Sequence, residues 1–329
     1  MLPATQSIGR LMCLVGICVA FAGIGMQHFT RYFIYFDALS HLTLHFAIAV
    51  IAFGWAFLLP RYCLLAALAM MITGVLALGL WVQLHPREMP PRGQDVPAGF
   101  RELRVMSFNT WLWNKEQDVI RVEIERQDPD IVFLAEVTSH DIRLSKELLA
   151  QFPFQYPEKR QRGQHLLLMS RYPLQDVQGR GVWTGPAYLQ GSLGPEWGNL
   201  TLLGTHTQRA PRVRAQWKQI NAIAQHISTI SHPRLVFGDF NASPYSHMVW
   251  QFAGITGMTR RSVLPTWPAT WPGLPQVAID HMFADDKLRF PDGVLAGRYA
   301  GSDHLPIVAR VFVPVGGQTA SLKAGSTNR

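Results

Sequence analysis

Six short segments in the last two-thirds of this 329-residue chain end hydrophobic runs with side chains able to bind a metal ion or a phosphate group. Together they supply carboxylates, carboxamides and imidazoles, the mixture that metal-assisted cleavage of a phosphate ester requires. Each segment alone is weak evidence, whereas their number and order predict one site. The segments are Ser107-Phe108-Asn109, Ala135-Glu136-Val137, Thr205-His206-Thr207, Gly238-Asp239-Phe240-Asn241, Ile279-Asp280-His281 and Ser302-Asp303-His304.

Two of these segments carry the carboxylates expected to act most directly. Glu136 follows the apolar run 131–135, and a charge directly after a buried strand is costly unless it is paired or bound to a metal ion. Either a salt bridge or a metal site accounts for it. Asp239 and Asn241 are two residues apart at a strand end, so their side chains point the same way. They form either a simple turn or a pair that activates water and holds phosphate.

The histidines and their neighbouring acids suggest acid–base chemistry. Asp303 and His304 are adjacent just before the last apolar strand, and His206 follows the strand 200–204. Asp280 lies within an apolar strand, where a buried carboxylate needs a partner, and orienting a histidine is a common solution. Structural hydrogen bonds explain each residue separately, but they explain the whole set less well.

Strand-like and helix-like segments alternate between residues 100 and 314, and each candidate residue lies at or just past a strand end. Rigid α/β scaffolds display their chemistry at such positions. The apolar patterns predict strands and one-faced helices. The strands are at 103–108, 131–134, 165–170, 199–204, 234–237, 277–283 and 307–312, and the helices at 119–127, 141–150 and 212–229.

The amino-terminal part differs in character from the rest. Residues 1–98 hold five arginines, no lysine and three acids, whereas 99–329 hold 25 basic and 19 acidic residues. Three apolar stretches, 8–26, 41–59 and 63–84, have about the length that crosses a hydrocarbon core of roughly 30 Å. We therefore expect three transmembrane helices in 1–85, a proline-rich linker at 86–99, a catalytic domain at 100–314 and a flexible tail at 315–329. A cleaved signal peptide is the alternative for the first stretch.

The charges do not decide which side of the membrane carries the catalytic domain. The arginines near the three stretches favour a cytoplasmic catalytic domain by the positive-inside rule, although acids are interleaved with several of them. All three cysteines, Cys13, Cys18 and Cys63, lie in the apolar stretches, so the catalytic part has no disulfide framework. The absence of disulfides is compatible with a catalytic domain on either side of the membrane.

The ordered motifs resemble the endonuclease/exonuclease/phosphatase superfamily, the DNase I-like metal-dependent phosphoesterases, from about Glu102 to Val313. The resemblance implies two packed mixed β-sheets flanked by helices, a four-layer α/β sandwich. It also implies Mg²⁺, with Mn²⁺ as a possible substitute, bound by Glu136 with help from Asn109 and Asp303. Membrane-tethered relatives often face away from the cytoplasm, and we adopt an extracytoplasmic catalytic domain as the expectation.

The same resemblance implies roles for the remaining residues. Asp239 positions or deprotonates the attacking water, and Asn241 holds the phosphate. His304, oriented by Asp280, and His206 provide acid–base help and charge stabilisation. Asp239 and His304 are equal candidates for the general base.

We therefore expect a membrane-anchored, Mg²⁺-dependent hydrolase of a phosphodiester. Its substrate is nucleic acid or a phospholipid headgroup, with the lipid bilayer as its other partner and no obligate protein partner. The spacing of the motifs is compact and leaves little room for loops that enter DNA grooves. The alternative is a catalytically inactive membrane-tethered binding module with the same fold. A transporter-like unit is disfavoured, because no acid lies within the three stretches.

Overall fold

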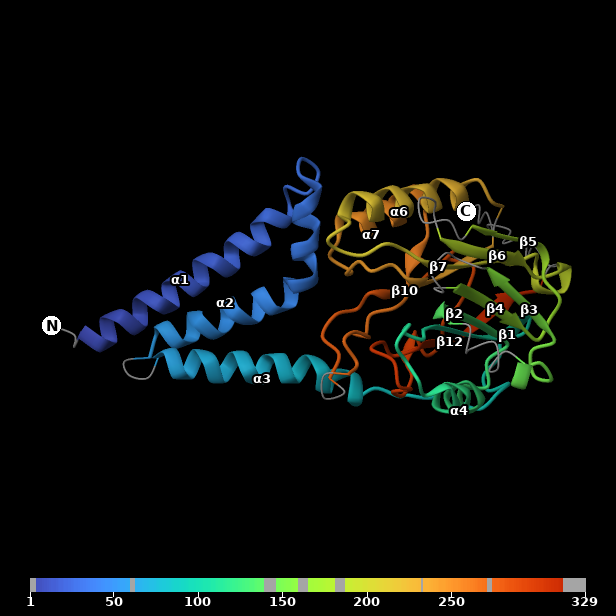
Figure 1. Ribbon diagram of the computed structural model, residues 1–329, viewed down its shortest axis with the longest axis horizontal. Coiled ribbons are helices and arrows are strands. Elements are labelled where there is room, and N and C mark those ends of the chain that lie inside the picture. Colours follow the sequence, from blue (N-terminus) through green and yellow to red (C-terminus); the bar gives the residue numbers. More distant parts are fainter. Residues whose placement is uncertain are drawn as a thin grey trace, which may run out of the picture.

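The computed structural model describes residues 4–59, 63–138, 146–158, 165–180, 187–231, 233–270 and 274–315. Figure 1 shows the long amino-terminal helices at one end and a body of strands and helices at the other. The body holds all of the candidate residues.

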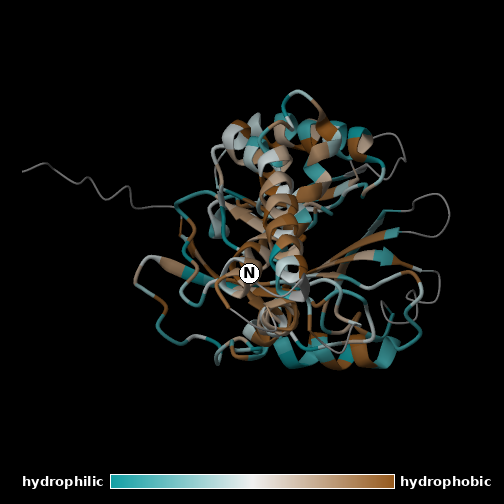
Figure 2. Cartoon of the chain, turned by 90° about the vertical axis from the view of Figure 1, so that its left-hand side faces the viewer, coloured by the Kyte–Doolittle hydropathy of each residue, from teal (hydrophilic) through white to brown (hydrophobic). Residues whose placement is uncertain are grey.

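The apolar amino-terminal stretches are helical. They form α1 (Ala4–Gln27), α2 (Thr43–Phe57) and α3 (Cys63–Gln83), with the 3-10 helix η1 (Ile34–Leu42) before α2. By length and composition alone, three segments are able to cross a membrane: Gln6–Gln27, Ile34–Phe57 and Cys63–Gln83. Figure 2 shows their apolar character beside the hydrophilic outer face of the helix at the bottom of the body, α4 (Gln117–Gln127). The predicted apolar stretches are thus confirmed as helices of spanning length.

The body contains two six-stranded sheets. The first has the order β11-β12-β1-β2-β4-β3, and the second has the order β5-β6-β7-β8-β10-β9. Most neighbours are antiparallel, but β1 with β2 and β7 with β8 are parallel. Their bounds are β1 Phe100–Asn109, β2 Ile131–Val137, β3 Phe154–Glu158, β4 His165–Ser170, β5 Gln175–Arg180, β6 Tyr188–Ser192, β7 Thr201–His206, β8 Arg234–Asp239, β9 Thr259–Arg260, β10 Asp280–Ala284, β11 Leu295–Ala296 and β12 Ile307–Pro314.

The two sheets pack face to face across the main hydrophobic core. Phe133 of β2 and Phe237 of β8 meet edge to face at 6.0 Å between ring centroids, and both are fully buried. Burying a side chain of this kind stabilises the fold by roughly 1.5–3 kcal/mol. This core fixes the first sheet against the second, and with it the strand ends that carry the candidate residues.

Helices cover the outer faces of both sheets. Helix α4 packs through Ile120 and Ile124 against the first sheet. Helices α6 (Val213–Ser228) and α7 (His247–Thr256) pack against the second. A short 3-10 helix, η3 (Pro195–Trp197), lies between β6 and β7. The predicted four-layer α/β sandwich of two mixed sheets is therefore confirmed.

Two predicted elements differ from the structure. The strand predicted at 277–283 begins only at Asp280, because Val277 forms an isolated bridge with Trp267 instead of joining the sheet. Half of the helix predicted at 141–150 lies outside the described residues, and its described part, 146–150, consists of two helical residues followed by turns.

The amino-terminal helices contact the body through two segments. Val82 of α3 packs with Leu264, Ala269 and Leu305, and the side chain of Arg87 donates to the carbonyl oxygens of Ala296 and Gly297. Ile34 and Ala38 of η1 pack against the cluster beneath α6 and α7. Residues 86–99, predicted as a linker, thus lie against the body in part.

Candidate active site

The strand ends bring the candidate residues together. Asn109 and Ala135 are paired at the ends of the parallel strands β1 and β2, so Glu136 follows directly beside Asn109. In the other sheet His206 is paired with Asp239 at the ends of the parallel strands β7 and β8. Asp280 begins β10 opposite Asp239. Parallel neighbours end at one edge of a sheet, so both sheets contribute side chains to the same place.

Gly238 allows the strands β7 and β8 to approach each other closely next to Asp239. Its φ is +140°, a conformation that residues with a side chain rarely adopt. A Cβ placed there would lie 1.9 Å from the carbonyl oxygen of Thr205 on β7. Glycine is therefore required at this position, and it sets how Asp239 approaches His206.

Glu136 sits at a β-bulge with a left-handed backbone. The register of β2 against β4 shifts between Leu134 and Val137, and the φ of Glu136 is +57°. This conformation is uncommon for a non-glycine residue and typical of functional sites. The carboxylate accepts hydrogen bonds from the backbone N–H of Leu112 at 3.0 Å and from Nδ2 of Asn109 at 3.2 Å. The bulge turns this carboxylate out of the core and toward Asn109.

Asp239 lies at the centre of the cluster and is 2% exposed. Its Oδ2 accepts hydrogen bonds from Nδ2 of Asn109 and of Asn241, both at 3.0 Å. The same oxygen is 3.6 Å from Nε2 of His206 and 3.8 Å from Nε2 of His304. Burial raises the pKa of Asp239 to about 7, against the opposing attraction of His304 and with a further rise from Asp280. The carboxyl group therefore titrates near neutral pH, as a proton acceptor in catalysis should.

His304 and Asp280 form a buried pair. Nδ1 of His304 lies 2.9 Å from Oδ2 of Asp280, and that oxygen also accepts a hydrogen bond from the hydroxyl of Thr266 at 2.6 Å. Burial opposes a charge on the imidazole, but Asp280 and Asp239 outweigh it and raise the pKa of His304 to about 10. The imidazole is held as a cation whose Nε2 faces Asp239.

His206 links the two sheets electrostatically. Its Nε2 lies 3.5 Å from Oε1 of Glu136 and 3.6 Å from Oδ2 of Asp239. Burial disfavours the ionised form of Glu136, but His206 and the hydrogen bonds from Leu112 and Asn109 outweigh burial and lower the pKa of this carboxyl. Glu136 therefore remains a carboxylate, which is the form that binds a metal ion.

Asp303 provides the clearest indication of a cation site. Its Oδ2 accepts a hydrogen bond from Nε1 of Trp267 at 3.1 Å, but its buried Oδ1 has no hydrogen-bond partner among the described residues. Burial raises its pKa, with Glu136 and Asp280 adding to the rise. Hard oxygen donors of this kind suit Mg²⁺ and Mn²⁺. The donors Glu136, Asp303 and Asn109 therefore fit a divalent ion.

A second group of donors shares no residue with this one. Asp239, Asp280 and His304 bring one ligand atom each within 4.8 Å of one another. However, Oδ2 of Asp280 already accepts from His304 and Thr266, and a metal-bound His304 would have to lose its proton. The first set fits a hard cation better, since it uses oxygen donors and leaves the Asp280–His304 pair intact.

The structure brings all eight candidate residues into this cluster. In the present arrangement Asn109 turns Nδ2 toward the carboxylates, and its Oδ1 accepts from the backbone N–H of Trp111. Asn241 uses Nδ2 to contact the Thr207 carbonyl and Asp239, so it orients Asp239. The individual roles of metal ligand for Asn109 and phosphate holder for Asn241 remain predictions.

His281, although part of the Ile279-Asp280-His281 segment, points away from the cluster. Its Nε2 lies 2.8 Å from the carbonyl oxygen of Ala242 and its Nδ1 lies 3.2 Å from the hydroxyl of Ser262. Burial lowers the pKa of this imidazole to about 4. His281 is thus a neutral core residue that supports the chain after Asn241.

Three supporting residues were not identified as site residues from the sequence. Thr266 and Trp267 contact Asp280 and Asp303, and Ser302 donates to the carbonyl oxygen of Asn109 at 2.7 Å. The indole N–H of Trp267 is thus used by Asp303. Hydroxyl and indole groups carry no sequence signal for such contacts, apart from the position of Ser302 beside Asp303.

Basic residues cluster in the sequence near the candidate residues, after His206 and before β4. They either steer an anionic substrate or are simply solvated. Arg209, Arg212 and Arg214 are exposed after the end of β7. The basic residues at 159, 160 and 162, and the tryptophan and proline at 271 and 272, lie outside the described residues.

Comparisons with known proteins agree with this geometry. The sequence model of the "Endonuclease/Exonuclease/phosphatase family" matches residues 106–304, which is more than half of the chain and runs from within β1 to His304. No curated protein sequence matches the chain.

Solved structures of the same fold share little sequence with it. An endonuclease/exonuclease/phosphatase family protein from Bacteroides thetaiotaomicron has a TM-score of 0.52 at 14% identity, covering 65% of this chain and 98% of that one. Humanized D. rerio TDP2 has a TM-score of 0.52 at 16% identity, covering 64% and 98%. A beta toxin mutant from Staphylococcus aureus, with bound magnesium ions, has a TM-score of 0.51 at 17% identity, covering 63% and 99%. At these identities the likeness shows the fold alone.

Proposed function

Because this chain belongs to the endonuclease/exonuclease/phosphatase family, we propose that it is a metal-dependent phosphodiesterase tethered to a membrane by its amino-terminal helices. The observation that carries this proposal is the buried Asp239 carboxyl, which faces the imidazoles of His206 and His304. His206 and Asn109 in turn link it to the carboxylate of Glu136. Strongly shifted pKa values of this kind cluster at functional sites.

The proposed reaction is attack of water on the phosphorus of a diester. Asp239 accepts the proton of the attacking water, since its pKa of about 7 lets it act as a base at neutral pH. The His304 imidazolium, held by Asp280, stabilises negative charge on the phosphoryl oxygens or donates a proton to the leaving oxygen. His206 adds a hydrogen-bond donor between Glu136 and Asp239.

A divalent cation, Mg²⁺ or Mn²⁺, would be held by Glu136 and Asp303, with Asn109 assisting. When bound, it supplies Lewis-acid neutralisation of the phosphate charge. Support for this comes from the carboxylate character of Glu136 and the orphaned buried Oδ1 of Asp303. The beta toxin structure of similar fold contains magnesium ions.

We further propose a phospholipid headgroup, rather than nucleic acid, as the substrate. The active-site loops lie against the ends of the apolar helices: Val82 of α3 packs on Leu305, next to His304. On the other side, Nε2 of His41 is 3.2 Å from the carbonyl oxygen of Asn241. A site in this position is reached from the plane of the bilayer more readily than by a duplex.

The first test measures hydrolysis of bis-p-nitrophenyl phosphate by the purified full-length protein in detergent. Activity is expected with Mg²⁺ and is expected to disappear with EDTA or in His304→Ala. Activity that survives either change would contradict the mechanism, and binding without any hydrolysis would support the alternative, an inactive binding module. A parallel panel of sphingomyelin-type lipid, plasmid DNA and inositol phosphates then identifies the substrate, with preferential hydrolysis of DNA contradicting the lipid proposal.

A further inference from the structure

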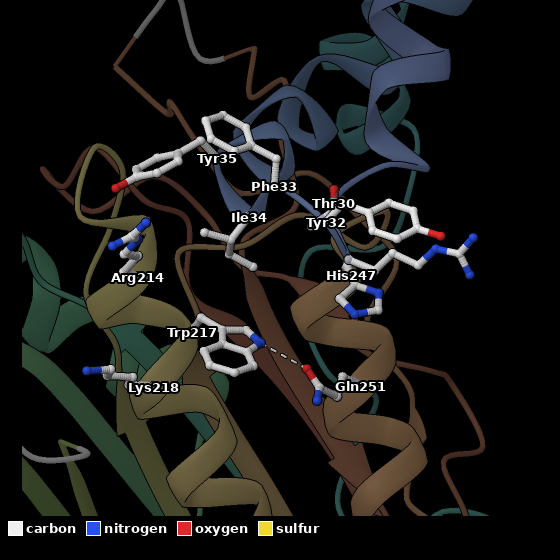
Figure 3. A pocket seen from close by; sticks show the side chains of 11 residues that line it. Thr30, Tyr32, Phe33, Ile34, Tyr35, Arg214, Trp217, Lys218, His247 and Gln251 are labelled. Carbon is white, nitrogen blue, oxygen red and sulfur yellow. Dashed lines mark hydrogen bonds between the residues drawn. The ribbon is translucent and has the colours of Figure 1, made fainter.

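A hollow of about 360 Å³, lined by aromatic and basic side chains, lies where the turn between α1 and η1 meets helices α6 and α7. Figure 3 shows Arg214 and Lys218 of α6 on one side and His247 and Gln251 of α7 on the other, with Trp217 between them. The indole N–H of Trp217 donates to Gln251 at 3.0 Å, so the floor is a fixed surface. The active-site cluster lies elsewhere, and none of its residues lines this hollow.

The hollow carries positive charge that the described residues leave unpaired. Arg31, Arg214 and Lys218 line it, and none of the three forms an ion pair with a described acid. The guanidinium of Arg31 lies over the ring of Tyr32 at 4.6 Å, and that of Arg214 lies over the ring of Tyr35 at 5.5 Å. Aromatic faces hold a cation in place without neutralising it.

Asp37, which contacts the lining residue His247, is already engaged. Oδ1 of Asp37 accepts from the backbone N–H of His247 at 2.7 Å, and its Oδ2 accepts from the hydroxyl of Ser246. Asp37 is 3% exposed and holds the amino-terminal end of α7. The Asp37 carboxylate therefore caps the amino-terminal end of α7. The positive charges of Arg31, Arg214 and Lys218 repel one another until an anion binds in the hollow.

The hollow is placed at the ends of the apolar helices. The first segment of spanning length ends at Gln27, three residues before the pocket wall begins at Thr30, and the second begins at Ile34. Tyr32 is 71% exposed and Phe33 is 50% exposed, next to these segments. Exposed aromatic rings at helix ends suit the headgroup layer of a bilayer.

We propose that this hollow binds the phosphate of an anionic phospholipid headgroup. Three unpaired cations match the charge, and a volume near the lower end of the range for small-ligand pockets suits a headgroup. The exposed rings beside it favour a phosphate that arrives attached to lipid rather than free in water or on a nucleic acid. Bound lipid would join the turn after α1 to α6 and α7, and so hold η1 against the loop that carries Asp239 and Asn241.

The test is binding of phosphatidylglycerol, phosphatidylcholine and inorganic phosphate to the full-length protein in detergent, followed by native mass spectrometry and thermal unfolding. Wild-type protein should retain phosphatidylglycerol in preference to phosphatidylcholine, with a raised unfolding temperature. The double variant Arg214→Gln/Lys218→Gln should bind it roughly 10- to 30-fold more weakly, because each basic residue near an anionic lipid contributes about 1 kcal/mol.

Controls separate this outcome from misfolding and from other ligands. Both substituted residues are exposed, so the double variant should keep its unfolding temperature in the absence of lipid. Lys287→Gln changes an exposed lysine at the opposite end of the second sheet and should bind like the wild type. The proposal is overturned if the double variant binds like the wild type, if phosphatidylcholine binds equally, or if inorganic phosphate or an oligonucleotide displaces the lipid at matched phosphate concentration.

Discussion

Nδ1 of His304 lies 2.9 Å from Oδ2 of Asp280, and both side chains are buried beneath the ends of the strands of the second sheet. The pair fixes the tautomer and direction of the imidazole, whose other nitrogen faces Asp239. This relationship determines which group gives and which group takes a proton in the proposed reaction.

Replacing Asp280 with Asn should therefore disable the site while the fold is retained. The amide removes the charge that keeps His304 protonated and correctly oriented, so we expect kcat to fall by roughly 10²- to 10⁴-fold. Steady-state hydrolysis of a chromogenic diester measures this. Asp286→Asn, at an exposed acid, serves as the control, and near-normal turnover by the Asp280→Asn enzyme would show that the pair has no catalytic role.

The dependence of activity on pH should be bell-shaped. Asp239 acts as a base and must be deprotonated, so kcat/KM should rise as pH passes about 7. His304 acts as a cation, so activity should fall as pH passes about 10. A bound divalent cation favours the Asp239 carboxylate, so the acidic limb should move to lower pH as the concentration of metal increases. A profile that falls rather than rises between pH 6 and about 8 would reverse the assigned roles.

Gly238→Ala should be among the most damaging small substitutions in the chain. The added methyl group would lie 1.9 Å from the carbonyl oxygen of Thr205, so β7 and β8 must separate. Gly293→Ala is a matched control, since its φ is also positive, +71°, but no atom lies within 4 Å of the added carbon. We expect Gly238→Ala to abolish activity and lower the unfolding temperature, whereas Gly293→Ala should lower the free energy of unfolding by only about 1–2 kcal/mol. Similar effects of the two variants would show that the close approach of the strands is not required.

Asp37→Ala should weaken the connection between the amino-terminal helices and the active-site loop. It leaves the hydroxyl of Ser246 and the backbone N–H of His247 without their acceptor, at a cost of about 1–3 kcal/mol in unfolding free energy. Because the same loop carries Asn241, diester hydrolysis should also decline. Thermal unfolding and activity of the full-length variant check both effects, with Asp286→Ala as the comparison. Unchanged stability would mean that this contact does not hold η1 to the body.

The sequence was sufficient to predict the layers of the fold and the gathering of the candidate side chains in one place. Strand ends in α/β folds gather at one edge, and Glu136 after one apolar run and Asp239 after another both lie against His206 and Asn109. Their catalytic and metal-binding roles stay predictions. Helix α6 was predicted from the sequence because its apolar residues repeat on one face.

Other features depend on contacts that no local pattern encodes. The left-handed backbone of Glu136 follows from a bulge against β4, and the hydrogen bond of Thr266 to Asp280 joins residues on separate loops. From the sequence, Asp37 was only an acid between two apolar stretches, with no predicted role. Its role at the amino-terminal end of α7 depends on packing between segments about 210 residues apart.

The most direct test of the central claim is a titration of Mg²⁺ into the metal-free full-length enzyme, with diester hydrolysis measured for the wild type and for Glu136→Gln. The wild type should be inactive after treatment with a chelator and should recover as Mg²⁺ is added. Glu136→Gln, which keeps the shape of the side chain but loses its charge, should require much more Mg²⁺ for the same activity. Full activity of the wild type without any divalent ion, or an unchanged Mg²⁺ requirement in Glu136→Gln, would contradict the account.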